Sequence, residues 1–164
     1  MNFRDVRQLF KLFVFTLCMG ISSVNAIEMG QTLPLGDVKL IDGKVMTSNQ
    51  RAKRFTIVQV WATWCPYCRA QNKTLQKLQD SVSAQQLNFL TISIDKNQEV
   101  VEKYMTDNRY HFPVAMMTPA LKDAIGKRKG VPELYVIDPN DQVVFKAYGQ
   151  LFDEDILELK RFAR

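Results

Sequence analysis

Two cysteines, Cys65 and Cys68, are separated by two residues in the segment Trp64-Cys65-Pro66-Tyr67-Cys68. Thiols at this spacing can close into a disulfide and reopen at little conformational cost, so they form a two-electron redox centre. A structural cross-link is a weaker interpretation, because a disulfide stabilises a fold more when it closes a longer loop. The pair therefore predicts thiol–disulfide exchange.

The segments around the cysteines predict a turn from a strand into a helix. The run from Phe55 to Trp61 is rich in β-branched and aromatic residues and is typical of a central strand buried on both faces. Pro66 suits the first turn of a helix, which we expect at residues 66–82. Helical spacing puts Cys68 and Gln71 on the side of this helix that faces the core.

The two sulfurs are expected to have different roles. Cys65 stands at the helix N-terminus, where free backbone N–H groups and the helix dipole favour a thiolate. We therefore expect Cys65 to be the exposed nucleophile. Cys68 lies one turn deeper and is expected to resolve the mixed disulfide by attacking Cys65.

The rest of the chain predicts an α/β domain with a mixed sheet covered by helices. Asp42-Gly43 lies between two short segments, 38–41 and 44–47, and predicts a β-hairpin ahead of the central strand. Further strands are expected at residues 87–94, 112–116, 134–137 and 142–148. Further helices are expected at residues 99–108, 118–125 and 153–162.

The N-terminal residues have the pattern of a secretory signal peptide. Three basic residues precede a short apolar run at residues 12–21, and residues 24–26 resemble a cleavage site. We expect residues 1–26 to be removed and residues 27–164 to form one periplasmic or otherwise exported domain. The apolar run is shorter than the roughly 20 residues that span a bilayer. An uncleaved N-terminal membrane anchor is the alternative.

The charge pattern does not indicate nucleic-acid binding. The formal net charge is +5, and removal of the leader, with its three bases and one acid, leaves +3. The bases are scattered except for Lys127-Arg128-Lys129, so the charge favours solubility and mild attraction to acidic partners. This cluster is either a solvated helix end or a docking patch next to Gly130-Val131-Pro132.

The stretches VQVWATWCPYC from Val58 and GVPELYVID from Gly130 resemble the exported TlpA/ResA group of thioredoxin-like thiol–disulfide oxidoreductases. The resemblance implies a thioredoxin-like three-layer fold with an extra N-terminal hairpin. It also implies a cis peptide bond between Val131 and Pro132 that faces the cysteines. Val131 would offer backbone hydrogen bonds to an extended substrate, and Trp64 would stand at the rim of the site.

Two glutamines depart from the family pattern. Thioredoxins carry a buried Asp, and TlpA/ResA proteins often an Asn, where this chain has Gln59. The TlpA/ResA group often carries a Glu that assists proton transfer where this chain has Gln71. Because glutamine cannot accept a proton in the working pH range, we expect slower resolution than in relatives with the Glu. The dipeptide Pro66-Tyr67 influences the reduction potential without fixing its value.

The expected function is an exported thiol–disulfide oxidoreductase that acts mainly as a reductant. By resemblance, its substrates would be exported proteins with disulfides or cysteine pairs, apocytochrome c among them. A membrane thiol reductase would supply electrons to the monomeric enzyme. The only redox group expected is the Cys65–Cys68 disulfide, with no other cofactor and no metal. A disulfide-forming oxidase or isomerase on the same fold is the first alternative.

Three further classes fit the residues less well. A copper carrier would need a third ligand near the proline loop, whereas the only histidine, His111, lies far upstream of that loop. A peroxidase would need a Thr-x-x-Cys site, whereas Thr63 stands two residues before Cys65. A non-catalytic chaperone would use the same groove for extended chains. Glu133 is expected to be an exposed acid at the start of a strand, or else to disfavour the Cys65 thiolate.

Overall fold

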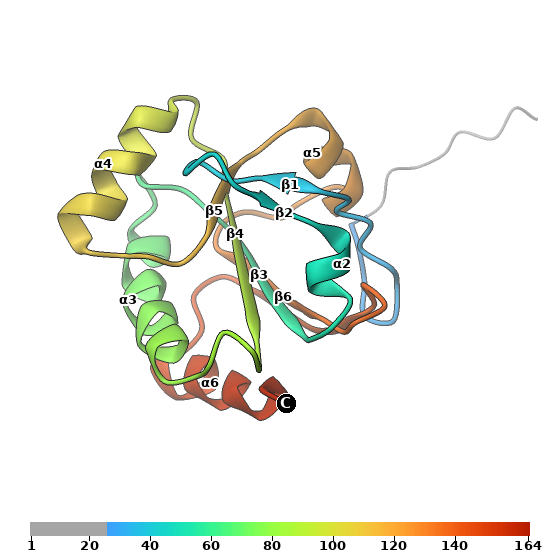
Figure 1. Cartoon of the computed structure of the whole chain (residues 1–164). Coiled ribbons are helices and arrows are strands. Elements are labelled where there is room, and N and C mark those ends of the chain that lie inside the picture. The colour runs from blue at the N-terminus through green and yellow to red at the C-terminus, as the bar shows by residue number, and fades with distance from the viewer. Residues whose placement is uncertain (1–25) are drawn as a thin grey trace, which may run out of the picture.

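The computed structural model describes residues 26–164, so the expected signal peptide lies outside the described residues except for Ala26 (Figure 1). The central sheet has the strand order β5-β4-β3-β6-β7. Its strands are Thr56–Trp61 (β3), Asn88–Ser93 (β4), Val114–Met116 (β5), Glu133–Ile137 (β6) and Val143–Tyr148 (β7). Strands β3, β4 and β5 run parallel, whereas β6 is antiparallel to both of its neighbours. The sheet is therefore mixed, as expected.

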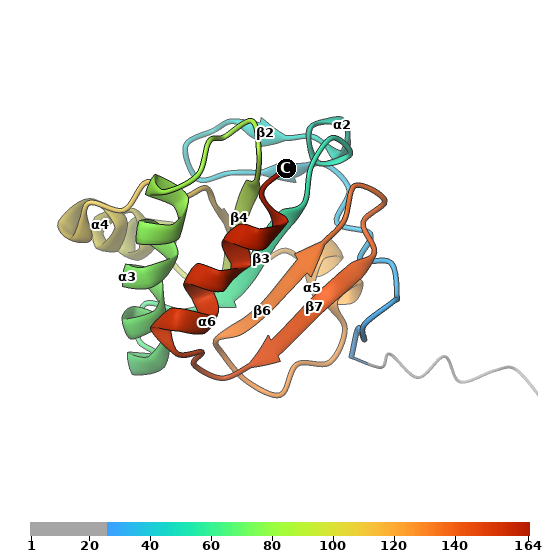
Figure 2. The ribbon, with the colours of Figure 1, turned by 90° about the horizontal axis from the view of Figure 1, so that it is seen from below.

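Helices cover both faces of this sheet and give the molecule three layers (Figures 1 and 2). One face packs against α3 (Pro66–Asp80), α4 (Gln98–Asn108) and α6 (Asp153–Glu158). The other face packs against α5 (Pro119–Ile125) and the segment that leads into the first hairpin. This arrangement is the thioredoxin-like fold that the resemblance implies.

The N-terminal hairpin is present and is followed by a short helix that the sequence analysis missed. Strands β1 (Val38–Lys39) and β2 (Val45–Met46) pair antiparallel. Helix α2 (Ser48–Arg51) comes next, and Thr47 and Gln50 cap it reciprocally through their side chains and backbone N–H groups. The spacing of Thr47 and Gln50 fits a capping box, but no apolar helical stripe follows it that would mark a longer helix.

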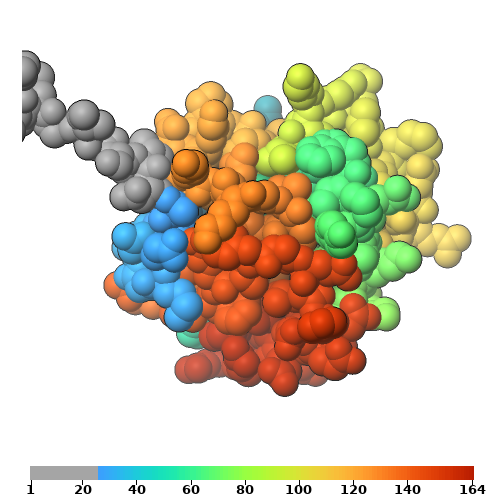
Figure 3. Space-filling view, turned by 180° about the vertical axis from the view of Figure 1, so that it is seen from behind, coloured from blue at the N-terminus to red at the C-terminus, as the bar shows by residue number. Residues whose placement is uncertain are grey.

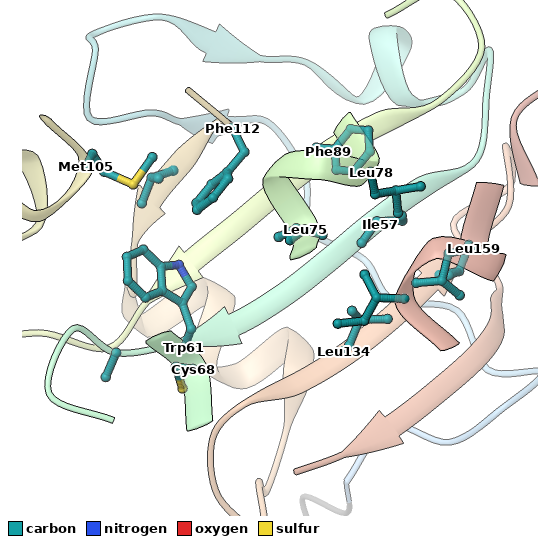
Figure 4. Close-up of a cluster of buried hydrophobic side chains, with 14 of the residues drawn as sticks. Ile57, Trp61, Cys68, Leu75, Leu78, Phe89, Met105, Phe112, Leu134 and Leu159 are labelled. Atoms are coloured by element: carbon teal, nitrogen blue, oxygen red, sulfur yellow. The ribbon is translucent and has the colours of Figure 1, made fainter. Parts of the chain in front are cut away.

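Strand β3 holds the core together because all of its side chains are buried. Ile57 and Trp61 face α3 and α4, whereas Val58 and Val60 face α5. Figure 4 shows Trp61 close to Cys68 and in the same apolar cluster as Leu75 and Phe112. The end of β3, which leads into the segment with Cys65 and Cys68, is thus fixed by packing on both faces.

The last helix differs from the expected single element at residues 153–162. Helix α6 ends at Glu158 and continues as a 3₁₀-helix, Leu159–Phe162 (η1). Its acids lie in the first turn and its bases in the last, as the helix dipole favours. Among residues 26–164, no helix has the length and apolar character needed to cross a bilayer.

Candidate active site

Cys65 is the N-cap residue of α3, at the point where the chain leaves β3. Its Sγ accepts a hydrogen bond of 3.3 Å from the backbone N–H of Cys68. Such a donor stabilises negative charge on the sulfur. The expectation of an exposed Cys65 was wrong, because the residue is only 4% exposed. Its remaining exposed surface faces a depression beside Val131, whose carbonyl oxygen lies 3.5 Å from the sulfur.

This depression is an open hollow of about 500 Å³, which we call the active-site hollow. It is lined by Trp64, Cys65, Pro66, Tyr67, Ile94, Arg128, Lys129, Gly130 and Val131. Its residues come from the start of α3, the end of β4 and the segment between α5 and β6. In the view from behind, the green surface at the start of α3 adjoins the orange surface of that segment (Figure 3). The hollow therefore joins parts of the chain that are far apart in sequence.

Cys68 lies directly behind Cys65 and is completely buried. Burial raises the pKa of the Cys68 thiol well above its usual value, and the neighbouring Cys65 raises it further. Cys68 therefore remains a protonated thiol at neutral pH. It is not among the residues that line the active-site hollow. The two sulfurs thus have unequal access to a substrate.

Val131 lies across the hollow from the first cysteine. The thiol of Cys65 points at the carbonyl oxygen of Val131, with 3.5 Å between sulfur and oxygen. The peptide bond between Val131 and Pro132 is cis. The carbonyl of Pro132 accepts a hydrogen bond of 2.9 Å from the N–H of Gly149, which ties this segment to the end of β7. The structure thus brings the predicted substrate loop against the predicted nucleophile.

The two glutamines of the sequence analysis meet in a buried amide network behind the cysteines. Nε2 of Gln71 donates to Oε1 of Gln59 at 2.8 Å, and Nε2 of Gln59 donates to Oδ1 of Asn72 at 2.6 Å. Oε1 of Gln71 accepts from the backbone N–H of Leu151 at 2.9 Å. The polar atoms of Gln71 thus point to these partners, and it forms no hydrogen bond with Cys68 in the described residues.

Asn72 is a member of this network that the sequence analysis missed. It is fully buried next to Gln71 on α3, and its Nδ2 has no hydrogen-bond partner within residues 26–164. A polar residue next to a predicted core position of an amphipathic helix was the available signal. It is a weak signal, because most such residues lie in solvent.

Asp95 is a second residue that the sequence analysis missed. Its carboxylate accepts hydrogen bonds from the backbone N–H of Thr63 at 2.9 Å and from the Thr63 hydroxyl at 2.7 Å. The hydroxyl of Ser93 donates to the same carboxylate at 2.7 Å. Asp95 thereby holds the turn that leads from β3 to Cys65. Its position just after a parallel strand beside β3 was the available signal, since such strand ends carry functional groups.

Glu133 does not lie where we expected it. It is 1% exposed rather than an exposed strand-start acid, because β6 is paired on both sides, with Val60 and Tyr148 opposite Glu133. Within the described residues, neither carboxylate oxygen of Glu133 accepts a well-aligned hydrogen bond. Burial raises the pKa of Glu133, while the Tyr135 hydroxyl and the positive charge of Lys146 act in the opposite direction.

The only histidine lies away from the cysteines. The ring of His111 is within hydrogen-bond distance of Gln76 and of Asp80, the last residue of α3. Cys65 caps the other end of this 15-residue helix, about 22 Å away along its axis. Within residues 26–164, no three His, Cys, Asp or Glu side chains are grouped so that they could hold a metal ion.

Comparison with known proteins agrees with this geometry. The model of the AhpC/TSA family matches residues 29–146. The chain is similar to sporulation thiol-disulfide oxidoreductase A of Bacillus subtilis, with 26% identity over 48% of this chain and 49% of that protein. It is also similar to thiol-disulfide oxidoreductase ResA of Oceanobacillus iheyensis, with 24% identity over 84% of this chain and 74% of that protein. The match thus spans about half of the first relative and about three quarters of the second.

Solved structures show the same fold. A thiol:disulfide interchange protein of the thioredoxin family from Chlorobium tepidum matches with a TM-score of 0.72 and 25% identity, over 85% of this chain and 98% of that one. StoA from Bacillus subtilis matches with a TM-score of 0.64 and 20% identity, over 74% of this chain and 92% of that one. The chain therefore belongs to the AhpC/TSA family and is, within it, an enzyme of the thiol–disulfide oxidoreductase type.

Proposed function

We propose that the chain is an exported enzyme that reduces disulfides in other exported proteins through Cys65 and Cys68. The unequal access of the two sulfurs to the active-site hollow carries this proposal. Cys65 lines the active-site hollow and accepts a hydrogen bond from the helix N-terminus, whereas Cys68 is completely buried behind it. Such an arrangement suits one sulfur that attacks and one that resolves.

The exchange proceeds in two balanced steps. The thiolate of Cys65 attacks one sulfur of the substrate disulfide, which forms a mixed disulfide and releases the other substrate sulfur as a thiolate that takes up a proton. Cys68 then loses its proton and attacks Sγ of Cys65, which breaks the mixed disulfide. The substrate leaves as a dithiol with two electrons from the pair, and the enzyme retains the Cys65–Cys68 disulfide.

Three residues are proposed to position the substrate during these steps. The carbonyl of Val131 lies 3.5 Å from Sγ of Cys65, within reach of a chain bound beside that sulfur. Pro132 holds the next peptide unit, and its carbonyl is already bound to Gly149. Trp64 is 66% exposed at the edge of the hollow and can cover apolar parts of the bound segment.

The cellular setting rests on the N-terminal sequence and on the resemblance. Residues 1–26 would direct export, and an uncleaved leader would instead tether the domain to a membrane. A reductant in an oxidising compartment must be reduced again after each turnover, which a membrane thiol reductase would do. Exported proteins with cysteine pairs, including apocytochrome c, would be the substrates.

A redox titration of the Cys65–Cys68 pair against glutathione or dithiothreitol tests the direction of the reaction. A potential near −250 mV or below supports a reductant, whereas one near −120 mV would make the chain an oxidant. Insulin reduction by the wild type and by Cys65→Ser separates catalysis from chaperone-like binding. The enzyme requires Cys65 for any reduction, whereas a chaperone would bind unfolded chains equally well in both forms.

The peroxidase alternative finds no support in the site. The Thr63 hydroxyl donates to Asp95 at 2.7 Å, so it is committed to holding the turn. The donor to Sγ of Cys65 is instead the N–H of Cys68. Hydroperoxide turnover measured beside disulfide reduction checks this assignment, and peroxide reduction as the faster reaction would reverse it.

A further inference from the structure

One wall of the active-site hollow is basic. Arg128 and Lys129, which we call the basic rim, line the same hollow as Cys65 and Val131. The residues that line this hollow include no Asp and no Glu. The neighbouring depression, formed by Tyr67 and residues 149–152, contains no acid either. The residues that line these two depressions therefore carry positive charge or none.

Neutral groups hold the two cations of the rim. Nη1 of Arg128 is 3.9 Å from the sulfur of Met117. Nζ of Lys129 lies 4.7 Å from the centre of the Tyr148 ring, in a cation–π contact. Neither cation is within 4.0 Å of a carboxylate oxygen in the part of the chain that the structure describes. Their positions are thus restricted while their charges remain uncompensated at short range.

Three acids lie near the rim but do not line the hollow. Glu28 is exposed, but it is paired with Lys146 at 3.1 Å, and Lys146 contacts the same Tyr148 ring as Lys129. Asp95 follows Ile94 of the lining, but its oxygens accept hydrogen bonds from Thr63 and Ser93. Glu133 attracts Arg128 from within the protein, but it is 1% exposed and cannot reach a substrate. The rim can therefore take an anionic group that a substrate brings.

We infer that the basic rim selects extended protein segments that carry Asp or Glu within a few residues of the cysteine that reacts with Cys65. This inference rests on the proposed function and names its substrate class. Trp64 and Tyr67, which are 66% and 62% exposed, provide an apolar part of the same hollow. A bound segment would thus contact both aromatic rings and cations. Complementary charge of this kind mainly determines specificity and association rate.

The test uses three synthetic peptides that contain one intramolecular disulfide and differ only in two flanking residues, which are Asp, Asn or Lys. The protein is the reduced 164-residue chain with Cys18→Ser, so that Cys65 and Cys68 are its only thiols. The second-order rate constant for peptide reduction is measured in a single turnover at low ionic strength. The readout is the rate constant for the Asp peptide divided by that for the Asn peptide, compared between protein variants. The intrinsic reactivity of each peptide is the same toward every variant, so it cancels in this comparison.

We expect this ratio to be about 3- to 10-fold higher for the wild-type rim than for Arg128→Gln/Lys129→Gln, as two exposed charge pairs would give. The Lys-to-Asn rate ratio should instead be lower for the wild-type rim than for Arg128→Gln/Lys129→Gln. The matched control, Lys53→Gln/Lys160→Gln, removes the same charge beyond the far end of β3 and should keep the wild-type ratio. The difference should shrink in 1 M salt, where screening acts over about 3 Å.

The outcomes separate this inference from the proposed function. An equal ratio for the wild-type rim and Arg128→Gln/Lys129→Gln, with all peptides reduced, would overturn the inference and leave the function standing. An equal loss of the ratio in the control variant would also overturn it, because net charge alone would then explain the preference. If the protein with the wild-type rim reduces none of the peptides, the proposed function fails and the inference fails with it.

Discussion

Gln71 and Gln59 share a buried hydrogen bond in which Nε2 of Gln71 lies 2.8 Å from Oε1 of Gln59. The bond has a fixed direction, because Oε1 of Gln71 already accepts from the N–H of Leu151. It joins α3, one turn after Cys68, to the central strand. By the resemblance, the neutral amide of Gln71 stands where TlpA/ResA proteins often carry a Glu, and that of Gln59 stands where thioredoxins carry an Asp. These amides cannot take a proton from Cys68, so water, Lys73 or the departing substrate thiolate has to do so.

Gln71→Glu should destabilise the protein at pH 7, because a carboxylate has no hydrogen to donate to Gln59. We expect the free energy of unfolding to fall by about 1–2 kcal/mol. Burial would raise the pKa of the new carboxyl above its unfolded value of about 4.3. The variant then has its full stability at a pH below that unfolded pKa, where the carboxyl is neutral. It loses stability as the pH rises through the folded pKa. Urea denaturation at pH 4 and pH 7 measures this, and an equal loss at both would contradict it.

The same Gln71→Glu variant should also shorten the life of the mixed disulfide, because a carboxylate near Cys68 can accept its proton. Rapid acid quenching followed by mass spectrometry gives the lifetime of the mixed species. Gln79→Glu, which adds the same charge near the other end of α3, is the control. An unchanged lifetime in Gln71→Glu would show that proton transfer from Cys68 does not limit resolution.

The two tryptophans should separate stability from substrate binding. Trp61 is completely buried, so Trp61→Ala should cost about 3–5 kcal/mol of folding free energy. Trp64 is 66% exposed, so Trp64→Ala should change stability by no more than about 0.5 kcal/mol. We expect Trp64→Ala to lower the rate of peptide reduction several-fold without unfolding the protein. Thermal melts and single-turnover rates check this, and a wild-type rate in Trp64→Ala would remove Trp64 from the substrate site.

Glu133→Gln should stabilise the protein at neutral pH, because it removes a buried charge. The expected gain is about 1 kcal/mol at pH 7. Burial raises the pKa of Glu133 in the folded protein. The wild-type protein therefore has its full stability at a pH below the pKa of Glu133 in the unfolded chain, and it loses stability as the pH rises through the folded pKa. The gain should therefore disappear toward pH 4. Glu154→Gln, on the exposed side of α6, is the control, and a loss of stability in Glu133→Gln at pH 7 would be the contrary result.

The position of the cysteines was predictable from sequence because local signals agree there. A β-branched run, a proline in the first helical turn and a helical apolar stripe all place Cys65 at a strand-to-helix turn. The structure has this turn, with Cys65 as the N-cap of α3. The expected strands of the central sheet and the helices that cover it are also present, with shifts of at most a few residues at their ends.

Burial that arises from distant parts of the chain was not predictable. Cys65 contacts a segment more than 60 residues later in sequence, and Glu133 is enclosed by strands on both sides. The partners of Asp95 and Asn72 likewise depend on how β3, β4 and α3 pack together. Local patterns give no information on such contacts, because a side chain's type does not reveal which remote segment will lie above it.

Trapping of the mixed disulfide tests the central claim, that Cys65 attacks and Cys68 resolves. Reduced Cys68→Ser and Cys65→Ser variants, each with Cys18→Ser, are mixed with a disulfide-containing peptide and analysed by intact mass spectrometry and peptide mapping. The account predicts a stable one-to-one adduct on Cys65 in the Cys68→Ser variant and almost none in the Cys65→Ser variant. An adduct that forms on Cys68 as readily as on Cys65 would contradict it.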